Sequence, residues 1–123
     1  MDLIQIQLDG KRGAFAPGES VSGTVSWQLD GPADSVEVRL FWYTRGKGTT
    51  DVQVVKAQHF DVTGASGKRP FKFVLPPEPY SFSGRLISLI WALEGVAQPG
   101  DRSQRLELVV GPAGREVVLG EPA

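Results

Sequence analysis

The sequence predicts an all-β fold in which two antiparallel sheets pack face to face as an immunoglobulin-like sandwich. Apolar and polar residues alternate with a period of two in several segments, as they do in half-buried strands. Stretches rich in glycine, proline, serine and aspartate separate these segments at a spacing typical of sandwiches. The chain of 123 residues suits one hydrophobic core, so we expect a single domain over residues 1–123.

The first half of the chain contains three expected strands. Residues 3–8 form the first, and residues 20–29 form the second, with Gly23 on its apolar side. Residues 16–19 place proline and glycine at the centre of a predicted type II turn, which starts the second strand. The third strand covers residues 35–44 and carries one apolar face, formed by Val36, Val38, Leu40 and Trp42.

The alternation slips in the fourth expected strand, over residues 52–62. Val54 and Val55 are adjacent apolar residues, which predicts a β-bulge because one extra residue would shift the phase. Residues 71–75 and 106–110 form two further alternating sets.

The segment at residues 86–93 fits one face of a helix and one face of a strand equally well. An otherwise all-β chain favours a long strand. The hydrophobic core is then expected to include Val21, Val25, Trp27, Val38, Leu40, Phe73, Leu75, Leu89 and Trp91.

Composition excludes several classes of protein. The net charge of −1 gives no bulk attraction to nucleic acid or to an anionic membrane. Cysteine is absent, so neither a disulfide nor a thiolate metal site is available. The longest apolar run is far shorter than the ~20 residues of a transmembrane helix. The start, "MDLIQIQLDG", has none of the features of a secretion signal, and we expect a cytoplasmic protein.

Two motifs carry a resemblance to a known family. They are "FAPGESVSG" at residues 15–23 and "FKFVLPPEPYSFSG" at residues 71–84, in this order. Together they resemble the arrestin-like domain family, which includes arrestins, the retromer subunit of that fold and bacterial sporulation-control proteins. The resemblance implies a β-sandwich of the adaptor or scaffold class, without catalysis. Arrestins have two sandwiches and this chain has room for one, so none of their binding residues is carried over.

The residues themselves offer no catalytic constellation. His59 is the single histidine, and a hydrolase would need it as a general base beside a serine such as Ser66 or Ser81. No nucleophile elbow surrounds either serine, so we interpret His59 as a strand histidine on a sheet face. Residues 64–69, "GASGKR", do not have the spacing of a phosphate-binding loop, and the carboxylates do not have metal-ligand spacing. We therefore expect no enzyme, no cofactor and no metal.

Three consecutive aromatics, at residues 41–43, identify a candidate surface. Trp42 shares the inward phase of Leu40, so the aromatic residues on either side of it face the other way. They either cover the outer face of the sheet, or are shielded by a loop, or form a contact surface for a partner or a sugar. If strands alternate in direction, the loops at one end gather the candidate partner-binding residues, which are Lys11, Arg12, Phe41, Tyr43, Arg45 and Lys47.

We therefore predict a non-catalytic interaction domain that binds another protein through loops and a sheet edge. The same edge would allow the chain to form a homo-oligomer. The alternative is a ligand- or carbohydrate-binding sandwich, since two exposed coplanar rings would favour a sugar. Buried tryptophans beside a free sheet edge would instead favour a protein partner. The aromatics that motivate the alternative are Trp27, Trp42, Tyr43, Tyr80 and Trp91.

Overall fold

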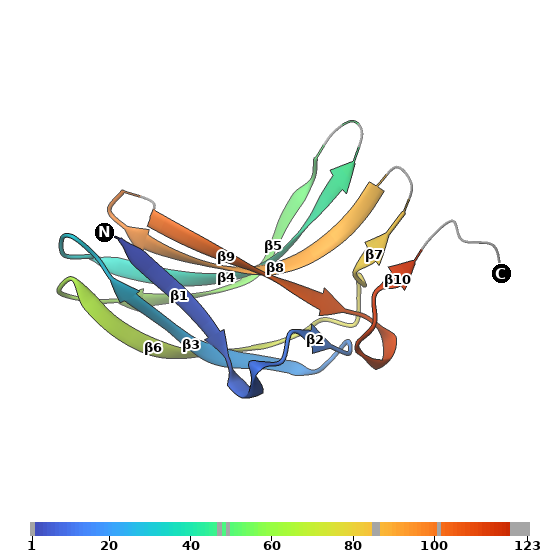
Figure 1. The fold of residues 1–123 in the computed structure, drawn as a ribbon, viewed down its shortest axis with the longest axis horizontal. Helices are drawn as coiled ribbons and strands as arrows, with labels where there is room; N and C mark the ends of the chain where they lie inside the picture. The colour runs from blue at the N-terminus through green and yellow to red at the C-terminus, as the bar shows by residue number, and fades with distance from the viewer. Residues whose placement is uncertain (1, 47, 49, 85–86, 101, 119–123) are drawn as a thin grey trace.

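The computed structural model describes residues 2–46, 48, 50–84, 87–100 and 102–118, with the backbone alone at 11, 113, 117 and 118. Two sheets face each other in the ribbon view (Figure 1). The smaller sheet has three antiparallel strands in the order β1 (Leu3–Leu8), β3 (Ser20–Gln28) and β6 (Ser66–Val74).

The larger sheet is built around two long strands, β4 (Ser35–Gly46) and β8 (Ile87–Gln98), with β5 (Val52–Asp61) at the outer side of β4. Two strands share the far side of β8, because β7 (Phe82–Ser83) pairs near its start and β9 (Arg102–Val110) pairs along the rest. The end of β4 and the starts of β5 and β8 extend away from the smaller sheet (Figure 1).

Short elements complete the larger sheet. The strands β2 (Ala14–Phe15) and β10 (Val117–Val118) pair in parallel with β9 and β7, respectively. Two 3₁₀ turns, η1 (Asp9–Lys11) and η2 (Pro112–Gly114), lie in the connections. The predicted sandwich of two antiparallel sheets is confirmed, with these two short parallel pairs as additions.

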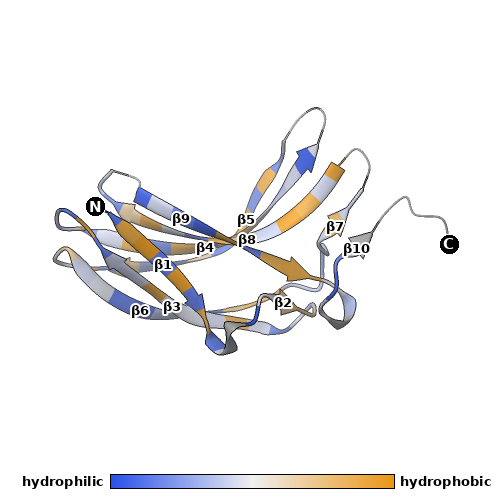
Figure 2. Ribbon diagram, viewed as in Figure 1, coloured by the Kyte–Doolittle hydropathy of each residue, from blue (hydrophilic) through white to orange (hydrophobic). Residues whose placement is uncertain are grey.

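The core lies between the sheets and contains every residue predicted for it. Figure 2 shows apolar segments along β1, β8 and β9, interrupted by more polar residues. Phe71 and Phe73 from β6 meet with ring centroids 5.9 Å apart, and Trp91 from β8 is fully buried. Without a disulfide, this burial is the main source of stability, at about 25 cal/mol for each Å² of apolar surface removed from water.

Three local predictions are also confirmed. Residues 87–98 form a strand, as favoured over a helix, while Leu86 lies outside the described residues. The β4–β5 register slips between Leu40 and Phe41, which leaves Val55 as the extra residue of a bulge. In the predicted type II turn, Gly18 has φ +83°, and the N–H of Glu19 donates to the carbonyl oxygen of Ala16 at 3.1 Å.

The connection at residues 76–84 is held by hydrogen bonds to the sheet. The N–H of Ser81 donates to the carbonyl oxygen of Val110 at 2.6 Å, and the N–H of Val110 donates to Ser81 Oγ at 2.9 Å. Trp91 Nε1 donates to the carbonyl oxygen of Pro79 at 2.9 Å, and the Glu78–Pro79 peptide bond is cis. The connection is therefore tied both to β9 and to the core.

Side chains close one side of the sandwich, where β5 meets β6. The amide of Gln58 bonds twice to the backbone of Lys72, donating to its carbonyl oxygen and accepting from its N–H, each at 3.2 Å. Lys56 Nζ donates to the carbonyl oxygen of Val74 at 3.2 Å. These bonds satisfy backbone groups at the edge of β6 that would otherwise be available to another strand.

Candidate interaction surface

An aromatic pair lies on the outer face of the larger sheet. Phe41 and Tyr43 have the outward phase of β4, and their rings stack with centroids 6.0 Å apart at an interplanar angle of 27°. With Ala92 and the half-buried Ile90 of β8 they form a second apolar cluster, separate from the core. Both rings are buried, which supports the interpretation that they cover the outer face of the sheet.

A guanidinium group from β9 covers these rings. The Cζ atom of Arg105 lies 4.9 Å from the ring centroid of Phe41 and 5.0 Å from that of Tyr43. Such cation–π contacts contribute about 0.5 to 1 kcal/mol each where water has access. Arg105 also approaches Glu94, with Nη2 3.7 Å from Oε2. The side chain therefore shields the aromatic pair while part of it remains exposed.

A polar network lies at the rim of the same cluster. Tyr43 Oη donates to Glu107 Oε2 at 2.7 Å, and Arg45 Nη2 lies 2.9 Å from Tyr43 Oη and 3.3 Å from Glu107 Oε2. Arg45 and Glu107 are exposed, so their ion pair contributes about 0 to 1 kcal/mol to folding. Their charged groups remain accessible to a partner. We call Phe41, Tyr43, Arg45, Arg105 and Glu107 the outer-face patch.

Of the residues predicted from sequence, the structure brings Phe41, Tyr43 and Arg45 together. Arg12 lies apart from them, where Nη2 bonds Glu19 Oε1 at 2.6 Å and the guanidinium stacks 4.7 Å from the centre of the Phe15 ring. The Lys11 side chain and Lys47 lie outside the described residues.

Arg12 is nevertheless connected to the patch through a shared hollow. This hollow has a volume of about 240 Å³ and lies between β1 and β9, with Arg12 and Glu107 both in its lining.

The side-chain hydrogen bond from Arg12, followed by the bond from the N–H of Ala16, holds the pKa of Glu19 below its ordinary value. The hydrogen bond to Glu19 raises the pKa of Arg12 in turn.

Sequence reasoning missed Arg105 and Glu107. Their outward phase could be read from the inward phase of Leu106, Leu108 and Val110. The missing information was that β9 pairs with β8, which places Glu107 opposite Ala92 and Arg105 opposite Glu94.

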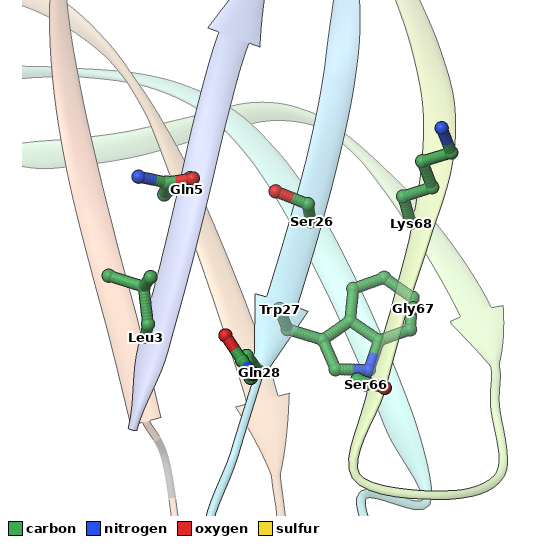
Figure 3. Close-up of a pocket in the computed structure, with 8 residues that line it drawn as sticks. All are labelled: Leu3, Gln5, Ser26, Trp27, Gln28, Ser66, Gly67 and Lys68. Atoms are coloured by element: carbon green, nitrogen blue, oxygen red, sulfur yellow. The ribbon is translucent and has the colours of Figure 1, made fainter. Parts of the chain in front are cut away.

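The tryptophans do not form a binding platform. Trp27 and Trp91 are buried in the core, and Trp42 is half-buried against it. The ring of Trp27 extends from β3 toward β6, where it occupies the space that a side chain at Gly67 would need (Figure 3). A hollow of about 430 Å³ lies here, lined by Leu3, Gln5, Ser26, Trp27, Gln28, Ser66, Gly67 and Lys68. The two exposed coplanar rings that would favour a sugar are not found among the tryptophans.

His59 lies on β5 as an exposed strand residue, as interpreted from sequence, with Nε2 3.1 Å from Asp61 Oδ1. Across the described residues, no three or more His, Cys, Asp or Glu side chains gather in a way that could hold a metal ion. The described part of the chain also contains no helix with the length and apolar character needed to cross a membrane.

Comparison with known proteins gives a structural match. No family model matches the sequence, and no curated protein matches it. Among solved structures, the chain superimposes on Spo0M, a sporulation control protein from Bacillus subtilis, with a TM-score of 0.66 and 20% sequence identity. The fold resembles that of Spo0M. The match covers 90% of this chain and 49% of Spo0M, so the chain spans about half the length of that protein. The likeness to Spo0M confirms the arrestin-like β-sandwich as the fold.

Proposed function

We propose that this chain is a non-catalytic interaction domain of the adaptor or scaffold class, which binds a partner protein through the outer-face patch and the hollow beside it. The burial of Trp27 and Trp91 carries the proposal, because it removes two of the aromatic rings that a sugar-binding face could use. A cytoplasmic location and a single sandwich over residues 1–123 are part of the same proposal. The fold likeness to Spo0M supports the regulatory or adaptor class.

The chemistry of the patch suits a protein partner. The stacked rings of Phe41 and Tyr43 are buried in fixed positions. Exposed side chains of both charges surround them, namely those of Arg45, Arg105 and Glu107. Arginine is enriched at protein interfaces, where its planar guanidinium can bond and stack at once. A nucleic-acid groove would instead need a clear excess of basic residues.

The test uses two charge reversals that leave the aromatic base intact. After affinity capture of a partner with the wild-type chain, Arg45→Glu combined with Arg105→Glu should weaken its binding at least tenfold. Tyr43 is unsuitable for this purpose because it is buried, so its truncation would also lower stability.

Lys68→Glu combined with Lys72→Glu is the matched control, since it reverses two exposed cations on the smaller sheet. We expect the control to bind and to unfold as the wild type does. The patch variant also loses the cation–π contacts of Arg105, about 0.5 to 1 kcal/mol each, so binding is compared at a temperature at which all three proteins are folded. Equal affinity for all three proteins would place the binding surface elsewhere. Selective binding of a glycan by the wild-type chain would favour the ligand-binding alternative.

A further inference from the structure

The edge strand β5 exposes two large apolar side chains. Val52 is 61% exposed and Val54 is 48% exposed, and both lie at the end of β5 that extends beyond the smaller sheet (Figure 1). Across the β4–β5 ladder Val52 lies opposite Tyr43 and Val54 lies opposite Phe41. Because opposite residues share a face, the valines continue the outer apolar cluster to the edge of the sheet.

The other side of β5 has no strand partner in the described part of the chain. One side of β5 forms a ladder with β4. The other side approaches β6, and the hydrogen bonds to β6 come from the side chains of Lys56 and Gln58. An edge strand with exposed valines is a template for pairing with another strand. β5 contains no proline or glycine to disturb such a ladder.

The bulge determines how β5 could pair with itself. Before the bulge, Val52 and Val54 face outward, and after it Ala57 and His59 face outward, opposite Arg39 and Glu37 of β4. The extra residue therefore shifts the alternation by one, so that outward-facing residues have even numbers before the bulge and odd numbers after it.

Two copies related by a twofold axis pair residues whose numbers have a constant sum. Among the registers that pair residues across the bulge, one matches faces throughout, with the axis between positions 55 and 56. Moving the register by two residues places Val54 against the inward Val55, or the inward Lys56 against Ala57. The pairs in the matching register are Val52 with His59, Gln53 with Gln58, Val54 with Ala57, and Val55 with Lys56.

We propose that two copies of this chain pair antiparallel through their β5 edges in this register, forming one continuous sheet across both copies. The interface is self-complementary, because each exposed valine is covered by Ala57 or His59 of the second copy. Lys56 meets Val55, so no like charges face each other, and the net charge of −1 adds little repulsion. This goes beyond the proposed function and does not rest on it, since the outer-face patch is not part of the interface.

A chain without cysteine allows the register to be tested by engineered disulfides. Opposed residues of an antiparallel pair have Cα atoms about 4.5 to 5.5 Å apart, within the range of about 4.4 to 6.8 Å for a disulfide. Val54→Cys combined with Ala57→Cys should therefore give a covalent dimer on mild oxidation. Within one strand these positions are roughly 10 Å apart, too far for an internal bond.

The single variants Val54→Cys and Ala57→Cys should remain monomeric on a non-reducing gel, because neither position meets its own copy. Leu3→Cys is the control for random collision, since Leu3 is 44% exposed but lies on β1, at the edge of the smaller sheet away from β6 and β5. Cross-linking of the double variant no greater than that of Leu3→Cys would overturn the register. Efficient cross-linking of Val54→Cys alone would overturn it as well.

The association itself is measured by sedimentation velocity over a concentration series. The wild type should show a concentration-dependent dimer, and Val54→Lys should shift it to monomer by placing a charge at the interface. Leu3→Lys, which adds the same charge at a similar exposure on β1, should leave the dimer unchanged. A wild type that remains monomeric at every concentration, or a dimer that persists in Val54→Lys, would refute pairing through β5.

Discussion

Truncation of Phe73 to alanine tests the placement of β6 in the sandwich. Phe73 is 3% exposed, and its ring packs 5.9 Å from that of Phe71 between the two sheets. Removing a buried phenylalanine ring costs about 3 to 5 kcal/mol, because the lost transfer energy is added to that of the cavity. Domains of this size have a total stability of about 5 to 15 kcal/mol, so the variant should lose a large share.

Urea unfolding followed by tryptophan fluorescence measures this loss, since Trp27 and Trp91 are buried and unfolding changes their surroundings. The control is Val74→Ala at the next position, where the side chain is 49% exposed and faces outward. It should change the free energy of unfolding by no more than ~0.5 kcal/mol. A loss below ~1 kcal/mol for Phe73→Ala, with an unchanged denaturant slope, would show that its ring does not face the core.

Gly23→Ala should cost about 1 to 3 kcal/mol in the same assay, because its Cβ would collide with the backbone oxygen of Gln7; wild-type stability would contradict the close β1–β3 approach. Arg12 lowers the pKa of Glu19, so the ionised Glu19 should stabilise the folded state fully above about pH 4.3, and this contribution should be lost as the pH falls further. The thermal midpoint of Glu19→Gln should therefore fall less steeply in acid than that of the wild type. An equally steep fall in both proteins would refute the linkage. The connection at residues 76–84 should resist limited proteolysis in the folded protein, and rapid cleavage there would mean that its hydrogen bonds are not maintained.

Local patterns in the sequence were sufficient for the predicted core residues and for the inward faces of the long strands. They placed the starts of β6 and β9 too late, since these strands begin at Ser66 and Arg102, in stretches whose glycine, serine and aspartate indicated turns. Side chains alternate along a strand whatever its neighbours are, so the inward set on β3, β4 and β6 could be identified before any pairing was known. The bulge was predictable for the same reason, because the adjacent Val54 and Val55 break a local period. Gly18 indicated its turn through the positive φ that a type II turn requires. The segment at residues 87–98 could not be assigned from its own pattern, which fits a helix and a strand equally well. The other predicted strands of the chain favoured a strand there.

Only the tertiary structure determined which outward-facing side chains lie next to one another. Phe41 and Tyr43 could be assigned to the outer face from their phase, but Arg105 lies more than sixty residues further along the chain. It reaches their rings only because β9 pairs with the far side of β8, and β8 with β4. The same pairing brings Glu107 to Tyr43, whereas Arg12 packs on Phe15 and Glu19 instead. Period and turn chemistry act within a few residues, whereas strand order depends on how the whole apolar surface is buried, which no single segment determines.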